Sequence, residues 1–232
     1  MLRMLLARLH QGRRTLRFPP RQPALPERYR GCPVRDGAGA GPAIDLGRSL
    51  FSPEEEAASL RDEHPLGFGG DYAMATRRRE DLLSTGGEIK LATALRKESR
   101  RLFGRSLRLR CVSAGGCNGC EAELNALSNV VFDVARFGIQ FVASPRHADA
   151  LVVVGAVSRN MNDALARTYE AMPEPRLVIA VGSCAISGGP FRGSPEVMDG
   201  VPTEIPVDLY VPGCPPHPLT LIDGLLRLLG RL

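Results

Sequence analysis

The run ADALVVVGAV at residues 148–157 decides the fold, because its centre is apolar at every position rather than at alternate ones. The run LVIAVGS at 177–183 has the same character. Strands that are buried on both faces of a parallel sheet are nearly continuous in Val and Ile, whereas half-exposed strands alternate apolar and polar residues. Both runs therefore predict strands of a parallel sheet that helices cover on its two faces.

On both sides of these runs, strand-like and helix-like segments alternate from residue 107 to residue 232. Further strands are expected at LRLRCV (107–112), FGIQFVAS (137–144) and VDLYVPG (207–213). Helices are expected at 119–130, at 161–172 and over the closing LTLIDGLLRLLGRL, which has Pro218 just ahead of it. The alternation predicts an α/β domain at 107–232 with a doubly wound, flavodoxin-like and mostly parallel sheet.

Residues 1–106 are expected to form an N-terminal extension that is largely irregular or helical. Four leucines recur near helical spacing among arginines at the start of the chain: Leu2, Leu5, Leu6 and Leu9. This pattern favours a basic amphipathic helix over residues 1–18 that lies on an anionic membrane surface. A helix docked on a partner subunit and a frayed terminus are the alternatives, and all of them stay open. Pro, Gly and Ala are frequent at 19–46, which indicates a linker. The charged segments 53–63 and 77–103 have helical propensity and favour exposed helices or segments that contact a partner.

Charge and hydropathy exclude several classes of protein. Lys and Arg number 30 against 25 Asp and Glu, and no aromatic-rich basic module accompanies them, so no nucleic-acid partner is expected. No stretch has the roughly 20 apolar residues that a transmembrane helix needs. Arg13 and Arg14 hint at twin-arginine export, but Phe18-Pro19-Pro20-Arg21 follows instead of an apolar region. We therefore expect no export signal and a cytoplasmic location.

Cysteines follow three of the predicted strands. Cys117 and Cys120 follow the strand at 107–112, Cys184 follows the strand at 177–183, and Cys214 follows the strand at 207–213. Ligands of open parallel sheets bind beyond the carboxyl ends of the strands, so four thiols are expected at one edge. Four thiolates fit either a [4Fe–4S] cluster or a tetrahedral zinc ion. Of the other cysteines, Cys111 is expected to be a small buried residue, and Cys32 receives no role.

Several motifs resemble those of a known family in the same order along the chain. They are CNGCEAE (117–123), RFGIQFVASPRHADALVVVGAVSRNM (136–161), GSCAISGG (182–189) and VDLYVPGCPPHP (207–218). The domain at 107–232 resembles the small iron–sulfur subunit of membrane-bound, energy-converting [NiFe] hydrogenases of the formate hydrogenlyase type. That subunit is homologous to the 20 kDa (B) subunit of complex I, an NADH:quinone oxidoreductase. The resemblance implies an oxidoreductase subunit that performs no catalysis alone.

The resemblance also implies a cofactor, partners and a location. Cys117, Cys120, Cys184 and Cys214 would ligate one [4Fe–4S] cluster next to the active site of a catalytic large subunit. Membrane subunits, and a ferredoxin-like subunit, are further implied partners at the cytoplasmic side of the inner membrane. The C-x-x-C spacing of Cys117 and Cys120 is typical of the hydrogenases, whereas complex I subunits have two adjacent cysteines at this motif. A subunit whose cluster lies next to a quinone site is the alternative within the family.

Two features near these motifs have more than one interpretation. Glu121 directly follows Cys120, and it either relays protons between subunits or stabilises the start of a helix with its negative charge. Arg146 and His147 either contact a partner, tune the cluster potential or lie in a solvated turn. Outside the family, a structural zinc protein and a metal-free scaffold are alternatives. A flavin site is disfavoured because the strand-end loops hold cysteines rather than phosphate-binding groups.

The N-terminal extension resembles a two-cluster ferredoxin-like subunit of the same complexes, through RYRGCP (28–33) and YAMATRRREDLL (72–83). A ferredoxin has C-x2-C-x2-C-x3-C between such segments. The corresponding positions here are Ser49, Ser52, Glu55 and Ser59. We therefore predict a degenerate remnant without a cluster, which is extended and depends on partners for its order.

Overall fold

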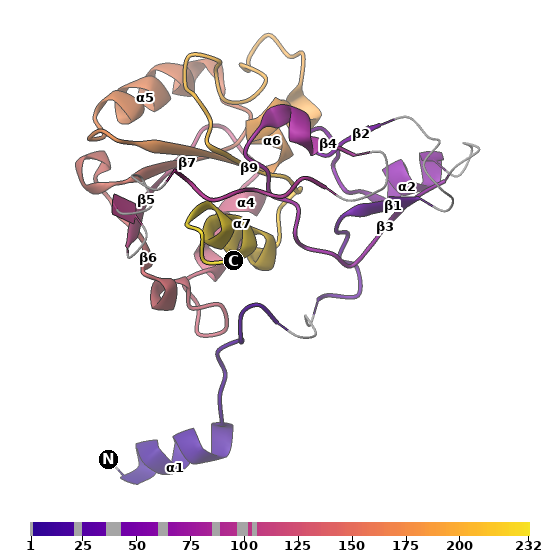
Figure 1. Cartoon of the computed structure of the whole chain (residues 1–232). Coiled ribbons are helices and arrows are strands. Elements are labelled where there is room, and N and C mark those ends of the chain that lie inside the picture. The colour runs from indigo at the N-terminus through magenta and orange to yellow at the C-terminus, as the bar shows by residue number, and fades with distance from the viewer. Residues whose placement is uncertain are drawn as a thin grey trace.

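The computed structural model describes residues 2–20, 25–35, 43–59, 65–84, 89–96, 102–103 and 106–232. A central sheet with helices on its two faces forms the body of the molecule (Figure 1). The short helices and strands of the N-terminal part lie against one side of this body, and helix α1 (Leu2–Gln11) projects away from it.

The central sheet has five parallel strands in the order β6-β5-β7-β8-β9. In chain order these are β5 (Leu107–Ser113), β6 (Ile139–Phe141), β7 (Ala150–Val154), β8 (Leu177–Val181) and β9 (Leu209–Val211). Every residue of β7 and β8 is buried, as their continuous apolar runs predict. The strand order is that of flavodoxin-like folds, so the predicted fold class is confirmed.

Successive residues of the central strands face opposite layers of helices. Leu151 and Val153 of β7 pack with Leu165 of α5 (Arg159–Glu170). Val152 and Val154 belong to the core on the other face, which α4 (Gly119–Ala126) and α7 (Pro218–Leu228) cover. The strands are therefore buried from both sides.

One helix of this domain was not predicted. Helix α6 (Gly182–Ser187) begins directly after β8, and all of its residues are buried. Cys184 therefore lies on a short helix rather than in a loop. The sequence GSCAIS gives little helical signal, because six residues include one glycine and two serines.

The N-terminal part consists of short elements. They are α1, β1 (Pro33–Arg35), β2 (Ile44–Asp45), α2 (Pro53–Ser59), β3 (Leu66–Phe68), the 3-10 turn η1 (Arg79–Leu82) and β4 (Leu83–Ser84). Strand β1 pairs antiparallel with β3, and β2 pairs antiparallel with β4. Of the alternatives for 77–103, the helix is wrong for 77–84 and 89–96, which contain η1, β4 and irregular chain. The helix expected at 53–63 extends over α2, and residues 60–63 lie outside the described residues.

The expectation of an extended N-terminal remnant is wrong for 43–59 and 65–84. Leu46, Met74 and Leu82 have no more than 2% of their surface exposed and form a core with Ala185 and Ile186 of α6. Backbone hydrogen bonds between Thr76 and Tyr210 further attach this part to the edge strand β9. These segments therefore have enough apolar residues to pack on the α/β domain.

A bidentate ion pair reinforces this packing. Nη1 and Nη2 of Arg79 donate to Oδ1 and Oδ2 of Asp45, each at 2.7 Å, and both side chains are mostly buried. Replacing Asp45 by Asn should lower the free energy of unfolding by about 1–2 kcal/mol, because a charge-assisted bidentate contact is lost. Urea unfolding of the two proteins would measure the difference.

The matched control for Asp45→Asn is Asp163→Asn. Asp163 pairs with Arg167 on the exposed surface of α5, where ion pairs contribute less than about 1 kcal/mol. Equal losses in the two variants would contradict a special role for the Asp45–Arg79 pair.

Candidate metal centre

The four predicted ligands lie at the carboxyl edge of the sheet. Cys117 follows β5, Cys120 lies in the first turn of α4, Cys184 lies on α6 after β8, and Cys214 follows β9. Cys184 is buried and Cys120 is partly buried, whereas Cys117 and Cys214 are exposed. The structure thus brings thiols from three strand ends to one edge, two of them sheltered and two at the surface.

Electrostatic effects show that these thiols lie near one another. Burial raises the pKa of Cys120, and charge on Cys184 and Cys214 raises it further. Burial also raises the pKa of Cys184 to about 11, with additional contributions from Cys214 and Cys117. Across the described ranges, no three His, Cys, Asp or Glu side chains form a group that could hold a single metal ion.

Glycines leave space around two of the sulfur atoms. A Cβ on Gly182, whose φ is +85°, would lie 2.5 Å from Sγ of Cys120. A Cβ on Gly189 would lie 2.8 Å from Sγ of Cys184. Any other residue at these positions would crowd the thiols. Sulfur donors that follow three strand ends, and glycines that leave space beside two of the sulfur atoms, fit a group that several thiolates hold together.

Glu121 lies at the same edge, in the first turn of α4. Ser113, the last residue of β5, donates a hydrogen bond from its Oγ to Oε1 of Glu121 at 2.5 Å. Its charge also contributes, after burial, to raising the pKa of Cys111 to about 11. The carboxylate is therefore held between the first strand and the helix that carries Cys120.

The N-terminal segment also contacts the cysteine edge, which the sequence did not reveal. Oγ of Ser183 donates to the backbone carbonyl of Ser49 at 2.5 Å, and Oγ of Ser187 donates to that of Gly47 at 2.6 Å. Ser183 directly precedes Cys184. Two serines on α6, on either side of the predicted ligand Cys184, could have indicated this contact from the sequence, since buried hydroxyl groups need hydrogen-bond partners.

Three of the four positions that the sequence comparison with ferredoxins singled out bond to one another. Oγ of Ser49 donates to Oε2 of Glu55 at 2.7 Å, and Oγ of Ser52 accepts from the backbone N–H of Glu55 at 3.3 Å. The backbone N–H of Leu50 donates to Oε1 of Glu55 at 2.7 Å. The side chain of Ser59 lies outside the described residues. Residues 49–55 therefore form a hydrogen-bonded turn at the positions where thiolates were expected in a ferredoxin.

The remaining candidates lie apart from this edge or have ordinary surroundings. Cys111 is partly buried against the main core, and Cys32 packs at the margin of the N-terminal core. Arg146 and His147 are exposed in a 3-10 turn just before β7, at the opposite end of the strands from the cysteines. This position favours a solvated turn or a surface contact over tuning of a cluster.

The fold and the site define an α/β domain of flavodoxin-like topology with a thiol-rich ligand edge. The model of the family described as NADH ubiquinone oxidoreductase, 20 kDa subunit, matches residues 117–228. The NADH-quinone oxidoreductase B protein of Heliobacterium modesticaldum is 48% identical over 120 residues, which are 51% of this chain and 69% of that protein. The chain therefore belongs to the NADH ubiquinone oxidoreductase 20 kDa subunit family.

Two further proteins are similar to this chain, and one of them is from the formate hydrogenlyase branch of the expected resemblance. Formate hydrogenlyase subunit 7 of Escherichia coli is 46% identical over 121 residues, 52% of this chain and 48% of that protein. A chain in the structure of the membrane-bound sulfane sulfur reductase, an archaeal respiratory membrane complex, is 31% identical with a TM-score of 0.51. That match covers 59% of this chain and 75% of the other. The expected family is confirmed, and its named members are subunits of oxidoreductases.

Proposed function

We propose that the chain is an electron-transfer subunit that holds one [4Fe–4S] cluster on Cys117, Cys120, Cys184 and Cys214. The observation that carries this proposal is the meeting of four thiols from three strand ends at one edge of the sheet. When bound, such a cluster takes up and passes on single electrons. The protein supplies the thiolates, and the buried α6 shields Cys184 from water.

Zinc is the alternative that the chemistry of four thiols leaves open, since four thiolates also hold a structural zinc ion, although the described side chains are not grouped around a single-ion site. Zinc has no redox chemistry in proteins, however, and the named relatives are subunits of oxidoreductases. An electron carrier accounts for both the donors and the family, whereas a zinc scaffold accounts for the donors alone and a metal-free scaffold accounts for neither.

We further propose a catalytic large subunit and membrane subunits as partners, with a ferredoxin-like subunit as an additional donor. The complex would lie at the cytoplasmic side of the inner membrane, with this chain attached peripherally. None of the described helices is long and apolar enough to span a bilayer. The C-x-x-C spacing favours a hydrogenase complex, and the similarity to NADH-quinone oxidoreductase subunits keeps a quinone-linked complex as the second candidate.

The experiment that tests this function uses the complex that a tag on this chain purifies anaerobically. In a hydrogenase complex, H₂ should produce the EPR signal of a reduced cubane. In a quinone-linked complex, the signal should respond to a quinol and quinone pair and not to H₂. If the signal responds to neither donor but appears with dithionite, the cluster is not a relay in these reactions.

Glu121→Gln tests the proposed proton relay. If the carboxylate carries protons, the variant should lose proton-coupled turnover by about a hundredfold, because its amide cannot exchange them. The cluster content should stay the same, because Glu121 is not a ligand. Turnover and the EPR signal of the assembled complex are the two measurements.

The matched control is Glu123→Gln on the same helix, where burial raises the pKa of the carboxyl group. It should leave turnover unchanged. If Glu121→Gln is as active as the control and only slightly less stable, Glu121 merely stabilises the start of α4, an effect of about 0.3–1 kcal/mol.

A further inference from the structure

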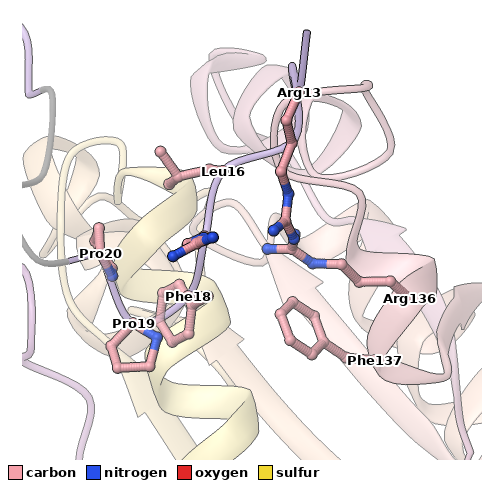
Figure 2. Close-up of a pocket in the computed structure, with 8 residues that line it drawn as sticks. Arg13, Leu16, Phe18, Pro19, Pro20, Arg136 and Phe137 are labelled. Carbon is pink, nitrogen blue, oxygen red and sulfur yellow. The ribbon is translucent and has the colours of Figure 1, made fainter.

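A cationic pocket lies far from the cysteine edge, where the chain leaves α1 and reaches the α/β domain. It has a volume of about 670 Å³, and its polar lining consists of Arg13, Arg17 and Arg136. Its apolar lining includes Phe18 and Phe137, whose ring centroids are 6.1 Å apart. Figure 2 shows the guanidinium groups of Arg13 and Arg136 close to one another above the Phe137 ring, with the Phe18 ring to one side. Three cations over an aromatic floor form the pocket.

The charges of this pocket are poorly compensated. Burial lowers the pKa of Arg136, and Arg13 lowers it further, while Asp133 acts in the opposite direction. Nε of Arg136 is buried without a hydrogen-bond partner, and its guanidinium lies 4.6 Å from the centroid of the Phe137 ring. Within the described ranges, no carboxylate forms an ion pair with Arg13, Arg17 or Arg136. Guanidinium groups arranged in this way are suited to a phosphate, which accepts several of their hydrogen bonds at once.

The surroundings of the pocket are apolar and basic. Five side chains of α1 are between 55% and 79% exposed: Leu2, Met4, Leu5, Leu6 and Leu9. Residues 1–20 contain five arginines and no Asp or Glu. The backbone N–H of Leu16 donates to the carbonyl of Val131 at 2.8 Å, which attaches this segment to the domain beside exposed Val130 and Val131. A phosphate in the pocket would therefore have a large apolar surface next to it.

We propose that this pocket binds the phosphate of an anionic membrane phospholipid while α1 lies in the same leaflet. Exposed leucines beside arginines are the arrangement of a helix that lies in the membrane interface. A free phosphate or a phosphopeptide would use the arginines but would leave the apolar side chains of α1 in water. A lipid accounts for both the arginines of the pocket and the exposed apolar side chains of α1, because its headgroup reaches the arginines and its acyl chains surround the leucines.

Vesicle flotation of the full, cluster-loaded chain tests this proposal. The protein should float with vesicles of phosphatidylcholine that contain phosphatidylglycerol, and much less with phosphatidylcholine alone. Arg13→Gln combined with Arg136→Gln should weaken binding by roughly 25-fold, since each basic residue at an anionic surface contributes about a fivefold gain. Arg136→Lys should recover part of the loss, because the charge returns without the planar fork.

The matched control is Arg167→Gln, which removes the same charge from the exposed surface of α5 and should bind like the unchanged chain. Leu5→Gln with Leu6→Gln should reduce binding to all vesicles by removing the insertion of α1. Iron content and circular dichroism verify that each variant is folded.

If the double arginine variant floats as well as the control, the pocket is not a lipid site. If inorganic phosphate displaces the vesicles but the leucine variant binds them normally, the site is one for free phosphate.

Discussion

Cys184→Ala is expected to abolish the cluster. Cys184 is the most deeply buried of the four proposed ligands, and α6 holds it directly behind β8. No other cysteine follows β8 before Cys214, which is itself a proposed ligand, so no thiol is available to replace it. Iron and sulfide in the anaerobically purified protein should fall to background, together with the EPR signal of the reduced cubane. Anaerobic iron and sulfide analysis makes the measurement.

The matched control for this loss is Cys111→Ala. Cys111 is also partly buried and lies in the strand that leads to Cys117, but it packs against the core. This variant should keep its full cluster and lose only the stability of a small side chain, about 1 kcal/mol. A cluster that survives Cys184→Ala, or one that disappears in Cys111→Ala with the fold intact, would mean that the ligand set is wrong.

Gly182→Ala is expected to be nearly as damaging, although it removes no ligand. The new Cβ would lie 2.5 Å from Sγ of Cys120, so the thiol must move away from the position it has at this edge. The left-handed φ of +85° adds a backbone cost of about 1 kcal/mol for any residue with a side chain. The protein should fold and bind less than half of the normal iron, as measured by iron content after reconstitution.

Gly193→Ala separates crowding at Cys120 from the backbone cost of a left-handed φ. Gly193 has a similar φ of +76°, but a Cβ there meets nothing within 4 Å. It should therefore lose a similar amount of stability and keep a full cluster. Equal loss of iron in both variants would attribute the effect to backbone strain instead of crowding at Cys120.

The sheet and its thiol edge could be predicted because local sequence determines them. Continuous apolar runs identified β7 and β8, which are the strands buried on both faces. Once these runs are strands of a parallel sheet, their carboxyl ends fix the edge at which Cys184 and Cys214 lie. The proposed ligand edge followed from strand positions alone.

The parts that escaped prediction depend on tertiary contacts. Helix α6 has six residues and weak propensity, and its burial against residues 46–51 stabilises it. The charged segment from residue 77 looked helical, but Arg79 pairs with Asp45, 34 positions earlier in the chain. Leu82 enters the N-terminal core at the end of η1. Pairings across such distances leave no periodic signal in the sequence.

The iron, sulfide and zinc content of the full chain, purified anaerobically, tests the central claim most directly, with EPR of the dithionite-reduced protein. The account predicts about four irons and about four sulfides per chain, with the signal of one reduced cubane and no zinc. Clearly more iron would contradict the absence of a second cluster at Ser49, Ser52, Glu55 and Ser59. Zinc, or folded protein without any metal, would contradict the electron-transfer function itself.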